Sequence, residues 1–272
     1  MKAKKVLFIT QEIAPYVSGS RMSQIGRHLP QSIQEKGREI RTFMPKWGNI
    51  NERRNQLHEV IRLSGMNLII DDTDHPLIIK VASIQSARMQ VYFIDNDDYF
   101  QGRDMTADEQ GNEYADNGER AIFYARGVLE TVKKLRWVPD IIHCHGWMTS
   151  LIPIYVKTAY KDEPSFRDSK IVFSLYDEGF HNDLQEDYLN QVLIKDMKPE
   201  LVEGIETPVN YTRLAQLAIN YSDGVIQNSA DTDQSLMQYA QERGVLTLPY
   251  QGEEGYEDAF NAFYDQVWGN EE

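Results

Sequence analysis

The chain has 272 residues, and its 42 acidic and 28 basic side chains give a formal net charge of −14. A field of this sign repels nucleic-acid phosphates and anionic lipid headgroups, so we expect neither nucleic acid nor a membrane surface as a partner. A hydrophobic content of 41% is ordinary for a globular protein with a packed core.

Two further features bear on the cellular compartment. Cys144 is the only cysteine in the sequence, which rules out a disulfide within the chain and fits a reducing environment. The basic N-terminus leads into an apolar run too short for a signal peptide, and no stretch approaches the length of a membrane span. We therefore expect a soluble, cytoplasmic protein.

The chain begins with the pattern of a strand–loop–helix–strand unit. Residues 6–9 form a short apolar run that predicts a buried strand, and residues 39–44 predict a second one. Between them, residues 22–35 repeat apolar side chains at helical spacing. Gly37 suits the end of this helix, whereas Pro30 is expected to bend or split it.

Residues 56–95 show a different pattern, in which polar turns separate closely spaced β-rich runs. These runs are 57–63, 66–70, 77–84 and 90–94. They predict antiparallel hairpins that are inserted into a parallel sheet or added to its edge. The polar stretch 99–117 predicts a loop.

The remainder of the chain alternates helical and strand patterns. Helices are predicted over residues 116–136, 149–159, 183–197, 208–221, 231–243 and 255–268. Strands are predicted over residues 141–144, 171–175, 224–227 and 245–248. This alternation predicts an α/β fold with a Rossmann-like, doubly wound, mostly parallel sheet covered by helices on both faces. Because no repeat or flexible linker interrupts it, we expect residues 1–272 to form a single domain.

Ligands of such folds bind beyond the carboxyl ends of the strands, where the strand order reverses. The residues that follow predicted strands are therefore the candidates, namely 11–21, 145–147, 176–180 and 228–231.

The first of these loops contains Ser18, Gly19, Ser20 and Arg21 in front of the predicted helix. Backbone N–H groups at a helix start can hold an anion, with the serine hydroxyls and Arg21 as side-chain donors. The loop lacks both the G-x-G-x-x-G pattern and a Walker lysine. A turn of small residues is also what any α/β unit requires here, so both interpretations stay open.

His143 and His145 project to the same side of a predicted strand, because side chains alternate along a strand. A zinc site would need further ligands, and the sequence signals none nearby, so we expect no metal. Histidines that hydrogen-bond a ligand or the backbone are the favoured interpretation. Asp177 and Glu178 follow another strand, either as an acid–base pair or as anions at a helix start.

Nucleophilic chemistry has no clear carrier in the sequence. Cys144 lies within a predicted strand, where we expect it to be buried and inert. Ser174 lacks the G-x-S-x-G context of a hydrolase nucleophile.

Several segments follow one another in an order that resembles the bacterial glycogen synthases and plant starch synthases. They are KVLFITQEIAPY from Lys5, GRHLP from Gly26, VYFIDN from Val91, YADNGER from Tyr114, WVPDIIHCHGWMTSLIPIYVK from Trp137 and AINYSDGVIQNS from Ala218. The segment from Trp137 is the most specific. The resemblance covers nearly the whole chain and corresponds to the N-terminal half of that family's enzyme.

The resemblance implies the first of two Rossmann-like domains of a retaining glucosyltransferase. Enzymes of that family move glucose from ADP-glucose to the non-reducing end of an α-1,4-glucan. We expect no cofactor, no metal and no catalytic residue in this chain. The expected substrate-binding residues are Ser18, Gly19, Ser20, Arg21, Tyr114, His145, Gly146, Trp147, Tyr176 and Asp177.

The chain departs from the family pattern at three places. The family loop Lys-Thr-Gly-Gly-Leu is VSGSR at residues 17–21, so a lysine is missing. Gly146 stands where the family has the aspartate of His-x-His-Asp-Trp, and Tyr176 where it has the histidine that faces the glucosyl group. The sequence also stops before the second domain of the family. We therefore expect a synthase-like domain that is inactive alone.

Three functions stay open. The first is a degenerate domain that binds α-glucan through Tyr114, Trp147 and Tyr176, or that pairs with a full-length glycogen synthase. The second is a half-enzyme that is active only with a separate C-terminal partner and then uses ADP-glucose. The third is a protein-interaction module without a sugar ligand, which would show an exposed apolar patch.

Overall fold

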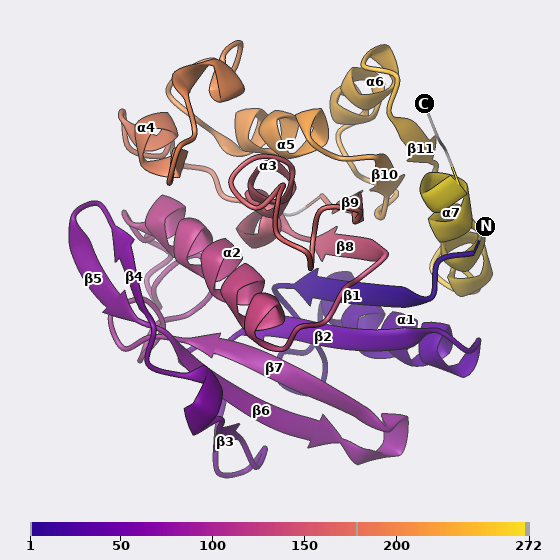
Figure 1. Ribbon diagram of the computed structural model, residues 1–272, viewed down its shortest axis with the longest axis horizontal. Helices are drawn as coiled ribbons and strands as arrows, with labels where there is room; N and C mark the ends of the chain where they lie inside the picture. Colours follow the sequence, from indigo (N-terminus) through magenta and orange to yellow (C-terminus); the bar gives the residue numbers. More distant parts are fainter. Residues whose placement is uncertain (1, 178, 270–272) are drawn as a thin grey trace.

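The structure, a computed structural model, describes residues 2–177 and 179–269, so the expectation for Glu178 lies outside the described residues. Its main sheet is built from β1 (Lys5–Thr10), β2 (Glu39–Pro45), β3 (His58–Glu59), β6 (Ile78–Ile84), β7 (Met89–Asp95), β8 (Ile141–His145), β9 (Lys170–Leu175), β10 (Gly224–Gln227) and β11 (Leu246–Leu248). These nine strands follow the order β11-β10-β9-β8-β1-β2-β7-β6-β3 (Figure 1). The predicted Rossmann-like, mostly parallel α/β sheet is confirmed.

The strand order reverses beside β1. The chain first adds β2 and then β7 on one side of β1, and later adds β8 to β11 on the other side. β1 pairs in parallel with both β2 and β8, and Thr10 lies opposite His145 in the register. The switch point of the sheet is therefore the gap between the carboxyl ends of β1 and β8.

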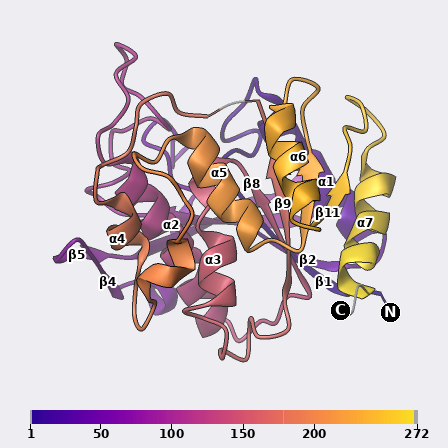
Figure 2. The same cartoon turned by 90° about the horizontal axis from the view of Figure 1, so that it is seen from above.

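Helices cover both faces of this sheet, as the fully buried strands require. One face carries α1 (Arg21–Glu35) and α7 (Glu257–Gly269). The other carries α2 (Asn117–Lys134), α3 (Ile152–Lys157), α5 (Tyr211–Asn220) and α6 (Gln234–Glu242). Figure 2 shows α7 on one side of the sheet and α2, α3 and α5 on the other. No helix of the described residues is long and apolar enough to cross a membrane.

The helix α1 forms as its sequence pattern predicts. Ile25, Leu29 and Ile33 are buried against the sheet. At its end, Gly37 has a φ of +94° and donates its N–H to Gln34 O at 2.9 Å, which is the glycine-terminated helix end that was predicted. The helix runs as one element through Pro30, so the predicted split does not occur.

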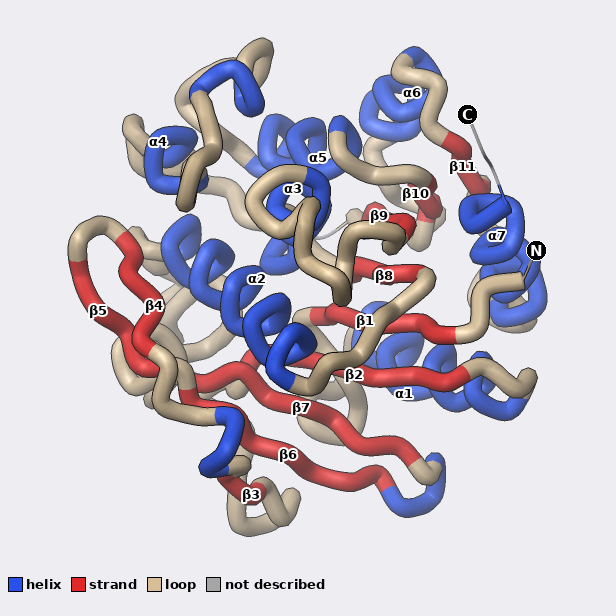
Figure 3. Tube along the Cα trace, in the orientation of Figure 1, coloured by secondary structure: helices blue, strands red, loops and turns tan. Residues whose placement is uncertain are grey.

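The region 56–95 forms the expected antiparallel structure at the edge of the sheet. β6 pairs antiparallel with β7, and β3 with β6. A separate hairpin consists of β4 (Asn67–Ile70) and β5 (Thr73–Pro76), and Figure 3 shows it apart from the main sheet. The predicted strand 57–63 was wrong in length, because only two residues pair before a 3₁₀ turn at Ile61–Leu63. β5 was missed, because Thr-Asp-His-Pro has no apolar alternation.

The helix predicted over residues 183–197 was largely wrong, since only α4 (Tyr188–Val192) is helical there. Leu184, Tyr188 and Val192 are all buried and have helical spacing. However, the Leu184 N–H donates to Val209 O at 2.8 Å, so a tertiary hydrogen bond holds this backbone in place of a helix. The helix predicted over residues 149–159 likewise begins as a 3₁₀ turn, Trp147–Thr149, and continues as α3.

The last helix, α7, is tied to the start of the chain through Arg38. This guanidinium donates to both carboxylate oxygens of Asp265, at 3.0 and 3.1 Å, and to Asn261 Oδ1 at 2.7 Å. The carboxylate also accepts the Ala3 N–H at 3.0 Å. Burial alone would raise the pKa of Asp265, but the hydrogen bonds from Arg38 and Ala3 lower it below its ordinary value of 3.8.

We predict that Asp265→Ala lowers the free energy of unfolding by about 2–3 kcal/mol, because it leaves the buried Arg38 guanidinium without its carboxylate. The ionised Asp265 carboxylate stabilises the fold at pH values above the ordinary carboxyl pKa. This stabilisation is lost as the pH falls from that value through the lower pKa of the folded state. Urea unfolding at pH 7 and pH 3 measures both effects. Asp258→Ala on the same helix is the control, because its pair with Lys36 is exposed and contributes at most about 0.5 kcal/mol. Equal losses in the two variants would contradict the prediction.

Candidate functional site

The loop that follows β1 reaches the N-terminus of α1 at the switch point. Ser20 caps α1, because its Oγ accepts the Ser23 N–H at 3.0 Å while Ser23 Oγ accepts the Ser20 N–H at 3.3 Å. The Ser20 hydroxyl also donates to Glu12 Oε1 at 3.1 Å. Gly19 has a φ of +95°, which favours glycine, and Ser18 is exposed. The helix cap therefore uses the Ser20 side chain that the sequence assigned to a ligand.

Arg21 is engaged by the segment that joins β11 to α7. Its guanidinium donates to three oxygens, Asn228 O at 2.7 Å, Gly252 O at 2.8 Å and Glu253 Oε2 at 2.8 Å. It also lies over the rings of Tyr250 and Tyr256, with 5.1 and 5.5 Å to the ring centroids. A carboxylate and two carbonyls thus occupy three of the five N–H donors of this guanidinium.

Tyr176 joins two other residues of the switch point in a buried hydrogen-bonded chain. Its Oη lies 2.8 Å from His145 Nδ1 and accepts the Asn228 side-chain N–H at 2.8 Å. Burial lowers the pKa of His145 to about 3 and raises that of Tyr176 well above its ordinary value. At neutral pH the phenol and the imidazole are therefore both uncharged.

His143 is buried directly beside His145, with 3.8 Å between the ring centroids. Its Nδ1 lies 2.6 Å from Tyr264 Oη and its Nε2 lies 2.7 Å from Ser174 Oγ. Burial, and secondarily His145, lower the pKa of His143 well below its ordinary value, so it is also neutral. Both histidines hydrogen-bond side chains, which is a kind of partner that the sequence did not predict.

Metal ligands and the single thiol are the remaining candidates for chemistry among the described residues. No group of three or more His, Cys, Asp or Glu side chains in the described residues is placed to hold a metal ion. Cys144 is fully buried, and burial raises the pKa of its thiol well above the ordinary value, which keeps it protonated and unreactive.

Gly146 and Gln11 fit against one another at the ends of β8 and β1. Gly146 has a φ of +93°, and a Cβ at this position would lie 2.3 Å from Gln11 Oε1. Gln11 is buried, and its Oε1 accepts the Met148 N–H at 3.2 Å. The sequence placed Gln11 in the candidate loop but gave no sign of this role. The only signal was its position directly after a buried strand.

The aromatic candidates lie apart from this chain of polar groups. Trp147 is only 3% exposed and packs edge to face on Phe180 at 5.2 Å between ring centroids, so it has little surface for a sugar. Tyr114 is half-buried and lines a cavity of about 290 Å³ together with Phe180 and Asn182. Asp177 is exposed. The structure therefore brings His145, Gly146, Tyr176 and Arg21 to one edge and places Tyr114 at a separate hollow.

Comparison with known proteins gives a consistent family relationship. The family described as the starch synthase catalytic domain matches residues 5–252. The glycogen synthase of Chlorobium luteolum is 38% identical over 201 residues, which are 74% of this chain and 40% of that protein. The glycogen synthase of Chlorobium limicola is 34% identical over 241 residues, which are 84% of this chain and 48% of that protein. The chain thus spans less than half the length of these curated relatives.

A solved structure shows the same fold. The catalytic domain of Starch Synthase IV from Arabidopsis thaliana, bound to ADP and acarbose, superposes with a TM-score of 0.70 at 18% sequence identity. The match covers 92% of this chain and 51% of that one. The doubly wound sheet is therefore shared with half of that domain.

We predict that Gly146→Ala destabilises the fold by about 2–3 kcal/mol, because it combines a strained positive φ with a clash against buried Gln11. Gly19→Ala is the matched control, since it has a similar φ but no atom within 4 Å of the added Cβ, and it should cost only about 1 kcal/mol. In a double-mutant cycle, Gln11→Ala should remove the excess cost of Gly146→Ala. If the losses in free energy of unfolding of the two single variants simply add in the double variant, as measured by thermal or urea unfolding, the fit between Gly146 and Gln11 is contradicted.

Proposed function

Because this chain belongs to the starch synthase catalytic domain family, we propose that it is a synthase-like domain of α-1,4-glucan biosynthesis that binds glucan but does not itself transfer glucose from ADP-glucose. The observation that carries this proposal is the engagement of Arg21 by Glu253 and Gly252. It leaves the loop at the switch point without a free cation.

A diphosphate leaving group needs positive charge or N–H donors where its negative charge develops. Arg21 is the only cation of the loop at residues 17–21, and each of its three nitrogens already donates one hydrogen bond to a protein oxygen. The Glu253 carboxylate adds negative charge beside the N-terminus of α1, where an anion would otherwise be stabilised. These contacts oppose the binding of a nucleotide sugar.

The groups expected at the glucosyl side support the same proposal. His145 is neutral, and its Nδ1 is taken by the Tyr176 hydroxyl. Position 146 carries no carboxylate, and the Gln11 side chain fills the space where its Cβ would lie. The carboxylate at position 146 and the histidine at position 176 that the family pattern places at the glucosyl side are both replaced in this chain.

Glucan binding is supported by the cavity beside Tyr114. Its volume of about 290 Å³ is close to the range typical of small-ligand sites. Tyr114 is half-buried and offers part of its ring, and Asn182 and Gln185 offer amide groups. Sugars combine apolar faces with hydroxyl groups, so a hollow with an aromatic side chain and amides suits them.

We predict that calorimetric titration with maltoheptaose gives saturable binding, whereas ADP-glucose gives no heat up to millimolar concentration. Asn182→Ala should weaken maltoheptaose binding about five- to tenfold, because it removes an amide that lines the cavity. Asn112→Ala, on the exposed loop before Glu113, serves as the control and should bind normally.

The outcomes separate the alternatives. Micromolar binding of ADP-glucose, or glucosyl transfer by the purified chain, would overturn the loss of the nucleotide-sugar site. Transfer that appears only after a second protein is added would favour the half-enzyme. If neither ADP-glucose nor maltoheptaose binds, a pure interaction module would be favoured.

A further inference from the structure

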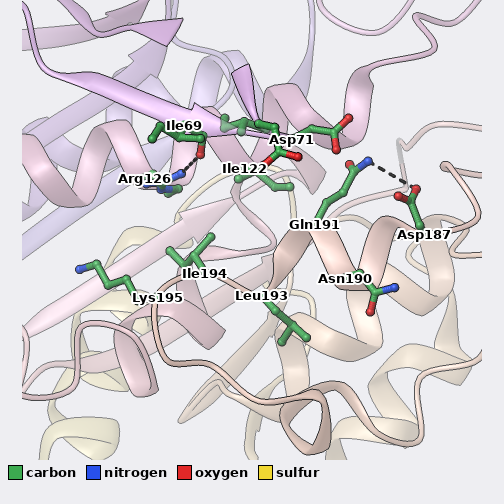
Figure 4. Close-up of a pocket in the computed structure, with 12 residues that line it drawn as sticks. Ile69, Asp71, Ile122, Arg126, Asp187, Asn190, Gln191, Leu193, Ile194 and Lys195 are labelled. Carbon is green, nitrogen blue, oxygen red and sulfur yellow. Dashed lines mark hydrogen bonds between the residues drawn. The ribbon is translucent and has the colours of Figure 1, made fainter. Parts of the chain in front are cut away.

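A second cavity lies away from the switch-point loops, between the β4–β5 hairpin, α2 and α4 (Figure 4). We call it the hairpin cavity; its polar lining includes Asp71, Arg126, Asp187 and Gln191, and its apolar lining includes Ile122 and Ile194. Its volume is about 410 Å³, within the range of roughly 300–1,000 Å³ that small-ligand sites occupy.

Two of the lining side chains carry a buried polar atom with no hydrogen-bond partner among the described residues. These atoms are Arg126 Nε, which is a donor, and Gln191 Oε1, which is an acceptor. The other end of each side chain is fixed. Arg126 Nη1 donates to Ile69 O at 2.5 Å, and Gln191 Nε2 donates to Asp187 Oδ1 at 3.4 Å, as the dashed lines of Figure 4 mark.

Buried polar atoms without partners are rare in folded proteins and call for water or a ligand. Here Gln191 Oε1 must accept a hydrogen bond, and Arg126 Nε–H must donate one. A phosphate only accepts and an ammonium only donates, whereas a hydroxyl group does both. The pair therefore favours a ligand that carries several hydroxyl groups.

The rest of the lining agrees with an uncharged ligand of this kind. Three aspartates, Asp71, Asp72 and Asp187, stand against the two cations Arg126 and Lys195, so neither sign dominates the cavity. In Figure 4 the side chains of Asp71 and Gln191 point toward the same space, where they offer acceptors to neighbouring hydroxyls.

The apolar part of the lining supplies the other half of the recognition. Leu193 and Ile194 are only partly buried in the lining, and Ile69 is 60% exposed. Such a surface suits the C–H face of a pyranose ring. From these contacts we propose that the hairpin cavity is a saccharide-binding site, distinct from the switch point and from the Tyr114 cavity. That its saccharide is an α-1,4-glucan rests on the proposed function.

The test is calorimetric titration of the full chain with maltoheptaose and, separately, with cellohexaose. Gln191→Ala should weaken binding of the preferred oligosaccharide about five- to tenfold, because it removes an acceptor that only the ligand satisfies. Gln238→Ala on α6 is the matched control, since its amide also bonds a neighbouring carboxylate, Glu242, on an exposed helix. It should leave binding unchanged.

A second measurement localises the ligand without relying on a variant that has to fold. Amide hydrogen exchange with and without the oligosaccharide should show protection in residues 187–195, and this protection should persist in Asn182→Ala. Ligand-induced protection confined to residues 113–117 and 180–185 would overturn the hairpin cavity and leave the proposed function intact.

The remaining outcomes are equally decisive. Gln191-dependent binding of cellohexaose without binding of maltoheptaose would support the hairpin cavity while the proposed function fails. Binding of neither oligosaccharide, or equal loss of binding in Gln191→Ala and Gln238→Ala, would overturn the inference.

Discussion

The burial of β1 on both faces and at both edges is the constraint on which the rest of the structure depends. This strand pairs with β2 on one side and β8 on the other. Val6 and Phe8 enter the core under α1 and α7, whereas Leu7 and Ile9 enter the core under α2. Residues 6–9 of this strand are all apolar, so its polar side chains lie at its two ends, and the candidate site lies beyond its carboxyl end.

Gln11, His145, Tyr176 and Asn228 at that edge are buried, and their polar groups therefore need partners. In this chain the partners come from the protein. Tyr176 bridges His145 and Asn228, Arg21 holds the segment before α7, and Gln11 fits against the glycine that ends β8. Most of these groups therefore reach a ligand only if an internal contact is first broken, whereas Asn228 Oδ1 is buried without a hydrogen-bond partner among the described residues.

The sequence predicted what local periodicity determines. β1, α1 and the strand–helix alternation follow from apolar spacing and from Gly37, and the structure confirms them. The partners of Arg21 lie 207 to 232 residues further along the chain, so no local pattern reveals that its charge is engaged. A contact with a distant residue also explains why the helix predicted over residues 183–197 was largely wrong. The Leu184 N–H donates to Val209 O, and this hydrogen bond holds the backbone outside a helix although the buried side chains have helical spacing.

Charge also separates the kinds of ligand that this fold can hold. A chain of net charge −14 repels anions unless a site concentrates positive charge, and the loop that would do so has its one arginine neutralised by Glu253. A neutral saccharide pays no such electrostatic penalty. It needs only hydroxyl partners and apolar surface, which the hollows beside Tyr114 and beneath the β4–β5 hairpin both provide. The net negative charge and the engaged loop thus act in the same direction, in agreement with the proposed preference for uncharged glucan over the nucleotide sugar.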